Sequence, residues 1–295
     1  MATAESIAPA APERRTRTRA RMVWGQFRRN RAGVIGLAIL VLFVVAALFA
    51  PQLAPHDPYE IMLESGLQKP SAQYWLGQDE LGRDLLSRII YGARLSMVIG
   101  IIAVAIGVGF GVPIGALSGY FGGWADLLTQ RVIDIMLAFP GILLAIVLVA
   151  VLGVGLPQVM VAVGIVSIPT YARLVRGQVL GMRSQEFVDA ARALGATSSR
   201  IIWRHVLPNT LAVIIVQSTL QFASAILAAA ALGFLGLGAQ PPAAEWGSML
   251  SNARQYIRLA PHSVTFPGVA IMLTVLGFNL LGDAVRDALD PRMRV

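Results

Sequence analysis

The sequence predicts an all-α, polytopic membrane protein with six transmembrane helices. Of its 295 residues, 56% are hydrophobic and only 14% are charged, and the mean hydropathy is +0.67. Soluble domains carry about 25% charged residues. The apolar runs are too long for the strands of a membrane barrel, which favours helices. The chain has no cysteine, which excludes disulfides and thiolate chemistry.

Six apolar stretches can cross a bilayer, since a span needs about 20 residues at a rise of about 1.5 Å each. They cover residues 32–53, 96–118, 132–153, 157–174, 210–235 and 267–285. The fourth is the least regular, because Pro169 interrupts it and Arg173 follows early. From Glu80 onward an amphipathic pattern precedes the second span, which indicates either an interfacial helix or a gate or docking element.

Charge bias predicts the orientation of the spans. Eight arginines lie in residues 14–31 and six in segment 172–209, whereas loop 54–95 has six carboxylates against four bases. Cytoplasmic loops collect Lys and Arg, so the tail and segment 172–209 are expected on one side, with four spans between them. Both termini are then expected in the cytoplasm. The net charge is +8, and the basic residues cluster in the segments that flank the apolar spans. This placement favours a membrane surface over nucleic acid as the partner of these residues.

The expected organisation has four parts. A basic cytoplasmic tail (1–31) precedes the first transmembrane helix with its external loop (32–95). A core transmembrane domain (96–285) and a cytoplasmic C-terminal tail (286–295) follow. Near the cytoplasmic end of the third span, Asp134 is expected to pair with Arg131.

The polar stretch 186–209, EFVDAARALGATSSRIIWRHVLPN, interrupts two strongly apolar segments. Its first half has apolar residues at the i, i+3, i+4, i+7 spacing of one helix face, namely Phe187, Ala190, Ala191 and Leu194. Glu186, Asp189 and Arg192 fall on the polar side. Gly195 follows the last apolar residue, where a helix favours glycine as a left-handed cap.

The second half of this stretch predicts another short helix. Thr197, Ser198 and Ser199 can cap its start. Ile201, Ile202 and His205 share one side, and Pro208 is expected to end the helix because the residue before a proline is pushed out of the helical region. The prediction is two short helices joined by a glycine bend, suited to grip another protein.

The chain shows no energy source of its own. The middles of the six spans carry no ionisable residue, which an ion-coupled carrier needs, and no GxxxxGK[ST] phosphate loop is present. No nucleophile–base pair and no metal-ligating set appears, which disfavours an enzyme or a metal site. A secondary carrier or channel is therefore the weaker hypothesis of a different class.

Uncharged polar residues do occur within the fifth and sixth spans. They either hydrogen-bond between helices or line a solute path. The candidate path-lining residues are Gln217, Ser218, Gln221 and Asn279.

Segment 186–209 resembles the EAA loop of binding-protein-dependent ABC importer permeases. The family pattern is Glu-Ala-Ala, three residues, Gly, nine residues, then Ile-x-Leu-Pro. This chain matches it with Asp189, Ala190, Ala191 and Gly195, followed by His205, Val206, Leu207 and Pro208. It departs in having Asp for Glu and His for Ile. Segments 74–97, 232–250 and 281–292 look like the C-type permease subunit of dipeptide and oligopeptide transporters.

The resemblance implies a type I ABC importer permease fold in a bacterial cytoplasmic membrane. It implies a second, B-type permease, two ATPase subunits or one fused ATPase, and an extracytoplasmic solute-binding protein. ATP and Mg²⁺ would sit on the ATPases, and this chain would bind no cofactor. Related permeases carry nickel, glutathione or haem, so the substrate stays open.

Within that family the loop 184–209 couples ATP-driven closure of the ATPases to alternating access. The residues it implies for contact with the ATPase are Glu186, Phe187, Asp189, Ala190, Ala191, Leu194, Gly195, Ile202 and Pro208. The alternative for this stretch is an amphipathic helix lying on the bilayer surface.

Overall fold

The computed structural model describes residues 24–289, and within them the chain is helical apart from loops and one isolated bridge, Gln78–Asp84. The predicted all-α class is therefore confirmed. The predicted tails 1–31 and 286–295 lie largely outside the described residues. The main helices are α2 (Arg31–Leu48), α3 (Ala50–Leu53), α4 (Leu85–Ile106), α5 (Val112–Phe121), α6 (Gly123–Ala138), α7 (Gly141–Leu152), α8 (Leu156–Met182), α9 (Glu186–Ala193), α10 (Ser198–Ile201), α11 (Leu207–Phe234), α12 (Trp246–Ala253) and α13 (His262–Leu289).

Four short elements join or extend these helices. They are the 3₁₀ turns η1 (Leu63–Ser65) and η4 (Arg254–Tyr256) and the π-helical turns η2 (Gly107–Gly111) and η3 (Ile202–Val206). Through the π turns, α4 runs into α5 and α10 runs into α11, which makes two helical rods, Leu85–Phe121 and Ser198–Phe234.

Five described helices are long and apolar enough to cross a membrane, and a bent pair could form a sixth span. The predicted span over 132–153 corresponds to this bent pair, in which α6 and α7 meet at an angle of 96°. Pro140 precedes α7, and Phe139 before it takes an extended conformation with ψ 137°. A residue that precedes proline avoids the α region, so the helix ends there.

Other boundaries also differ from the predicted ones. The second span begins at Leu85, because Asp84 caps the helix by accepting a hydrogen bond from the Ser87 amide, so the amphipathic stretch is partly the first turns of this span. The fourth span continues to Met182 with Pro169 inside it. Helix α4 therefore begins before its predicted apolar stretch, and helix α8 ends after its own.

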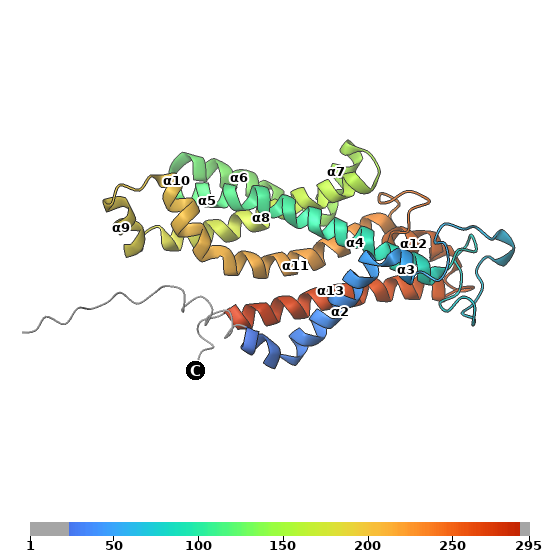
Figure 1. The fold of residues 1–295 in the computed structure, drawn as a ribbon. Coiled ribbons are helices and arrows are strands. Elements are labelled where there is room, and N and C mark those ends of the chain that lie inside the picture. The colour runs from blue at the N-terminus through green and yellow to red at the C-terminus, as the bar shows by residue number, and fades with distance from the viewer. Residues whose placement is uncertain (1–23, 290–295) are drawn as a thin grey trace, which may run out of the picture.

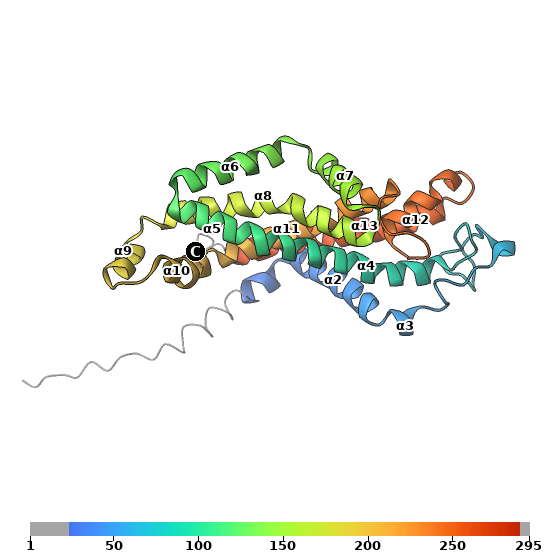
Figure 2. The ribbon, with the colours of Figure 1, turned by 90° about the horizontal axis from the view of Figure 1, so that it is seen from above.

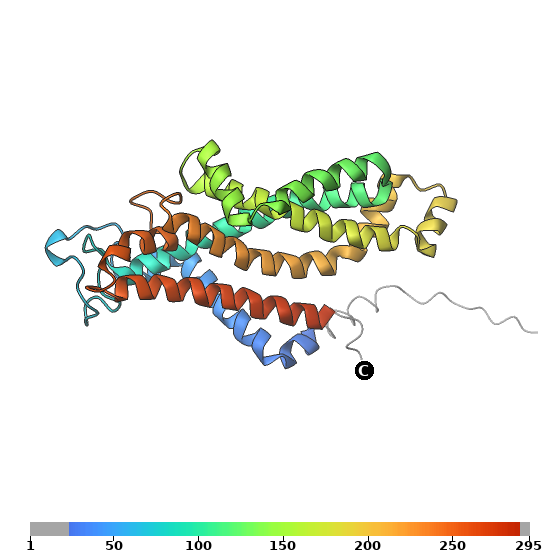
Figure 3. The same ribbon diagram turned by 180° about the vertical axis from the view of Figure 1, so that it is seen from behind.

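The bundle is elongated, with its loops at one end and the α9–α10 hairpin at the other (Figures 1 and 3). Helix α2 lies along α13, and α5 lies along α8. The start of α2 and the end of α13 meet, where Asn30 Nδ2 donates to Asp287 Oδ2 over 3.3 Å. Seen from above, α6 and α7 lie along the outer edge of the bundle (Figure 2). Both described chain ends therefore lie toward the end that carries the hairpin.

Candidate functional site

The α9–α10 hairpin begins with a short helix whose charges suit its dipole. Glu186 and Asp189 lie in the first turn of α9 and Arg192 in the last. Gly195 follows with φ +79°, the left-handed conformation expected of a glycine cap. The Gly195 amide donates to the Arg192 carbonyl (2.9 Å), and the Ala196 amide donates to the Ala191 carbonyl (3.0 Å). These two bonds form a Schellman motif, so the predicted glycine bend is confirmed.

The second helix of the hairpin does not end at Pro208, which corrects the prediction. Thr197 caps α10, its Oγ1 accepting from the Arg200 amide over 3.4 Å. The backbone then widens into the π turn η3, in which the Leu207 amide bonds to the Ile202 carbonyl five residues back. A proline in a regular α-helix would clash with the carbonyl four residues earlier. The wider turn accommodates Pro208 in the first turn of α11.

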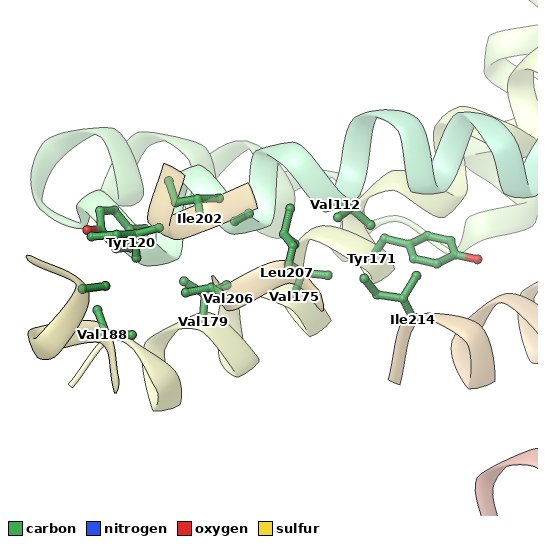
Figure 4. Packing of buried hydrophobic residues seen from close by; sticks show 13 residues of the cluster. Val112, Tyr120, Tyr171, Val175, Val179, Val188, Ile202, Val206, Leu207 and Ile214 are labelled. Carbon is green, nitrogen blue, oxygen red and sulfur yellow. The ribbon is translucent and has the colours of Figure 1, made fainter. Parts of the chain in front are cut away.

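A buried apolar cluster holds the hairpin on the end of the bundle (Figure 4). Val188 of α9 and the pair Ile201 and Ile202 of the second helix are almost fully buried in it. Much of the rest of the cluster comes from α5, α8, η3 and α11, including Tyr120, Val175, Val179, Val206 and Leu207. Burial at about 25 cal/mol per Å² of apolar area stabilises this contact. The hairpin is thus packed on α5, α8 and α11 rather than projecting as a free loop.

The apolar face of α9 divides between the bundle and the surface. Ala191 is 9% exposed and packs inward beside Val188, which the spacing argument missed. Phe187 is 37% exposed and Leu194 is 88% exposed, and Ala190 is exposed as well. Of the predicted four-residue stripe, only Ala191 therefore packs on the bundle, and the other three residues lie at the surface. Trp203, which the sequence analysis did not single out, adds a third large apolar side chain to this surface and is 53% exposed.

The other predicted contact residues are also placed by the structure. Glu186, Asp189 and Gly195 are exposed on α9 and at its end, and Pro208 is exposed at the start of α11. Ile202 is 1% exposed, so it supports the hairpin from within.

Arg192 links the hairpin to the tip of α5. Its Nη1 donates to Asp189 Oδ1 over 3.0 Å, and its Nη2 donates to the Tyr120 hydroxyl over 3.5 Å. The guanidinium carbon also lies 5.5 Å from the centre of the Tyr120 ring, within cation–π range. The hydrogen bond to Tyr120 raises the pKa of Arg192, so the side chain stays charged.

Ion pairs join α8 to α6 close to this end. Arg176 donates two hydrogen bonds to Asp126, from Nε to Oδ1 over 2.6 Å and from Nη2 to Oδ2 over 2.7 Å. Asp134 pairs with Arg173 over 2.6 Å, which corrects the expected Arg131–Asp134 pair. Arg173 reaches Asp134 from the neighbouring helix, a contact that sequence spacing does not reveal.

The four candidate path-lining residues do not gather in one cavity. All four are partly exposed, with Gln217, Ser218 and Gln221 on α11 and Asn279 on α13. Ser218 accepts a hydrogen bond from the Tyr171 hydroxyl (3.1 Å), so it joins α11 to α8. Asn279 lines an open, mostly apolar groove of about 790 Å³ between α11 and α13. Within residues 24–289, Gln217 and Gln221 have no side-chain hydrogen bond.

In the described part of the chain, no group of three His, Asp or Glu side chains is placed to hold a metal ion.

Comparison with known proteins gives consistent matches along the chain. Residues 111–295 match a family model described as a binding-protein-dependent transport system inner membrane component, and residues 18–70 match the N-terminal transmembrane domain of oligopeptide transport permease C. The dipeptide transport system permease protein DppC of Alkalihalophilus pseudofirmus is 52% identical over 93% of this chain and 90% of its own. The glutathione transport system permease protein GsiD of Escherichia coli O157:H7 is 47% identical over 92% of this chain and 90% of its own.

The fold also has solved counterparts. A structure described as an inward facing conformation of the MetNI methionine ABC transporter aligns with a TM-score of 0.57 and 20% identity. The alignment covers 70% of this chain and 98% of that chain. This likeness shows a common fold, the type I ABC importer permease fold.

Proposed function

Because this chain belongs to the family of binding-protein-dependent transport system inner membrane components, as a C-type permease of the peptide branch, we propose that it forms half of a transmembrane path for di- and oligopeptides. A B-type permease would supply the other half. An extracytoplasmic binding protein would deliver the solute, and two ATPase subunits or one fused ATPase would bind ATP and Mg²⁺. This chain would itself hold no cofactor and catalyse no reaction.

The observation that carries this proposal is that the α9–α10 hairpin is anchored on the bundle and also exposes apolar side chains. Val188 and Ala191 anchor it on the bundle, while Phe187 and Leu194 present apolar surface outward. Water-exposed apolar side chains on a rigid projection are typical of a protein contact. Glu186 and Asp189 beside them supply charge for orientation. In the proposed mechanism an ATPase cleft receives this surface, and closure around ATP moves α5, α8 and α11 with the hairpin.

The proposed orientation places the hairpin and both termini in the cytoplasm. The arginine bias of segment 172–209 and of the N-terminal tail supports this assignment. The meeting of α2 with the end of α13 at the hairpin end is consistent with an even number of crossings. Alternating access would then switch the path lined by α11 and α13 between outside and inside.

The decisive experiment replaces Leu194 by glutamate in the complete transporter. Leu194 is 88% exposed, so Leu194→Glu leaves folding intact while it places a charge in the proposed ATPase contact. Leu259→Glu, at a residue that is 67% exposed at the opposite end, is the matched control. We expect Leu194→Glu to lose ATPase co-purification and peptide uptake in proteoliposomes, and the control to keep both. Wild-type uptake by Leu194→Glu would refute the coupling role.

Glutathione is a second candidate substrate, because the Escherichia coli glutathione permease is nearly as similar as the dipeptide permease. Nickel and haem carriers remain further alternatives within the same architecture. Uptake measured in parallel with labelled dipeptide, glutathione, nickel and haem, each with the cognate binding protein, separates them. If the transporter imports glutathione but not dipeptide, the substrate is glutathione, and the proposed role as a permease is unchanged.

A further inference from the structure

Four charged side chains meet at the end of the bundle opposite the α9–α10 hairpin. Arg83 is 4% exposed and Arg88 is 2% exposed. Arg83 Nε donates to Asp79 Oδ2 over 2.7 Å, and its Nη2 donates to Glu80 Oε1 over 3.1 Å. Arg88 Nε lies 3.3 Å from the same Asp79 oxygen. Burying ion pairs costs desolvation energy and gives little net stability, so a merely structural role does not account for this cluster well.

The two arginines keep donors that the cluster does not use. Arg88 Nη1 donates to the Pro58 carbonyl (2.9 Å) and Nη2 to the Ala243 carbonyl (3.4 Å), which leaves the second N–H of each of these groups without a hydrogen bond in the described residues, whereas the buried Nε faces Asp79. Within the same residues Arg83 bonds through its backbone amide, Nε and Nη2, and not through Nη1. Guanidinium groups with spare N–H donors are suited to hold a carboxylate.

A cavity of about 270 Å³ opens beside these donors. Its lining includes Glu80, Arg83 and Arg88. The lining also includes Ser248, Ser251, Asn252 and Gln255, which come from α12 and η4. The side chains of Ser251, Asn252 and Gln255 make no hydrogen bond within residues 24–289, so their hydroxyl and amide groups are available to a ligand.

The residues that line the cavity indicate the chemical class of its ligand. Arg83 and Arg88 line the cavity together with Glu80, and Asp79 balances their charge from outside the lining. The remaining N–H groups of the arginines can therefore hold a carboxylate by directed hydrogen bonds rather than by net charge, and the amides of Asn252 and Gln255 can pair with peptide groups. The volume lies just below the range of about 300–1,000 Å³ usual for small-molecule sites, so the cavity suits a small ligand. We propose that this cavity is an extracytoplasmic site that receives the carboxyl end of a short peptide, with Arg83 and Arg88 facing the carboxylate and Asn252 and Gln255 the peptide amide. The inference deepens the proposed peptide import and rests on it and on the proposed orientation.

The chain offers a direct test because it has no cysteine of its own. Asn252→Cys places a single thiol at the cavity, and Gln73→Cys places one at an exposed amide residue of the same external region that does not line the cavity. The complete transporter is reconstituted, and the rate of maleimide labelling of this subunit is followed by mass spectrometry. The probes are dialanine and dialanine amide, which lacks the carboxylate. Peptide uptake by the unsubstituted transporter is measured beside it.

We expect dialanine to slow the labelling of Asn252→Cys about tenfold at saturation, dialanine amide to have little effect, and Gln73→Cys to respond to neither. Equal protection by both probes, or none, in a transporter that imports dialanine overturns the site and leaves the proposed function standing. Protection of Asn252→Cys by the binding protein without peptide also overturns it, because a protein segment then fills the cavity. A transporter that imports no peptide refutes the proposed function instead.

Discussion

Replacing Gly195 tests whether the bend between α9 and α10 depends on its left-handed backbone. Gly195 has φ +79°, and no atom lies within 4 Å of the position that a Cβ would take. Gly195→Ala therefore introduces no clash, and its cost is the left-handed conformation alone, about 1–2 kcal/mol for an L-residue. That cost corresponds to a factor of about 5–30 in the population of the intact cap.

Hydrogen–deuterium exchange of the segment 186–196 measures this population. We expect the amides of Gly195 and Ala196, which close the Schellman motif, to exchange about 5–30-fold faster in Gly195→Ala. Gly195→Asn should show a smaller change, because asparagine tolerates the left-handed region.

Gly177→Ala is the matched control for this substitution. Gly177 also has no atom within 4 Å of its Cβ position, but it lies inside α8 without a positive φ. Alanine there should stabilise the helix by up to about 1 kcal/mol, so the sign of the effect is reversed. Equal exchange rates for the Gly195, Ala and Asn forms would refute the argument that the backbone conformation holds the bend.

Three further substitutions test other parts of the structure. Arg176→Ala removes both hydrogen bonds from α8 to Asp126 and should cost about 2 kcal/mol, seen as a lower Tm in detergent that Arg176→Lys partly restores. Trp246 is fully buried and donates from Nε1 to the Ile89 carbonyl (3.1 Å), so Trp246→Ala should cost about 3–5 kcal/mol and Trp246→Phe clearly less, as measured by chemical unfolding. Burial raises the pKa of Glu80 above its ordinary value of 4.5, so its contribution to stability is full below that pH and is lost as pH rises through the raised pKa. Glu80→Gln should flatten this part of the Tm profile across the acidic range, and an unchanged slope would contradict the assignment.

Much of the fold follows from local patterns in the chain. Long apolar runs predict helices that cross a membrane, because a bilayer requires every backbone group to bond within its own helix. The spacing of residues 187–194 predicts α9, and Gly195 predicts its end, since a left-handed cap depends on a few neighbouring residues only. Pro140 could also have predicted the bend between α6 and α7, but the apolar residues on both sides of it were interpreted as one continuous span.

Other features depend on contacts that the chain order does not display. Whether Pro208 ends a helix depended on the π turn before it, which Val206 and Leu207 support by packing into the cluster beneath the hairpin. Which residue of the α9 stripe faces the bundle depended on where α5 and α8 lie. Arg88 and Ala243 are 155 positions apart and meet only in the folded chain.

The sequence by itself determined the membrane class, the helical composition, the side on which segment 186–209 is expected and the kinship with ABC importer permeases. These properties come from composition, periodicity and short motifs, which act over a few turns of helix. Only the tertiary structure decided which apolar residues of α9 stay exposed and which charged groups share the cavity beside Arg83. Both depend on free energies of burial and pairing, which exist only once distant segments have excluded water between them.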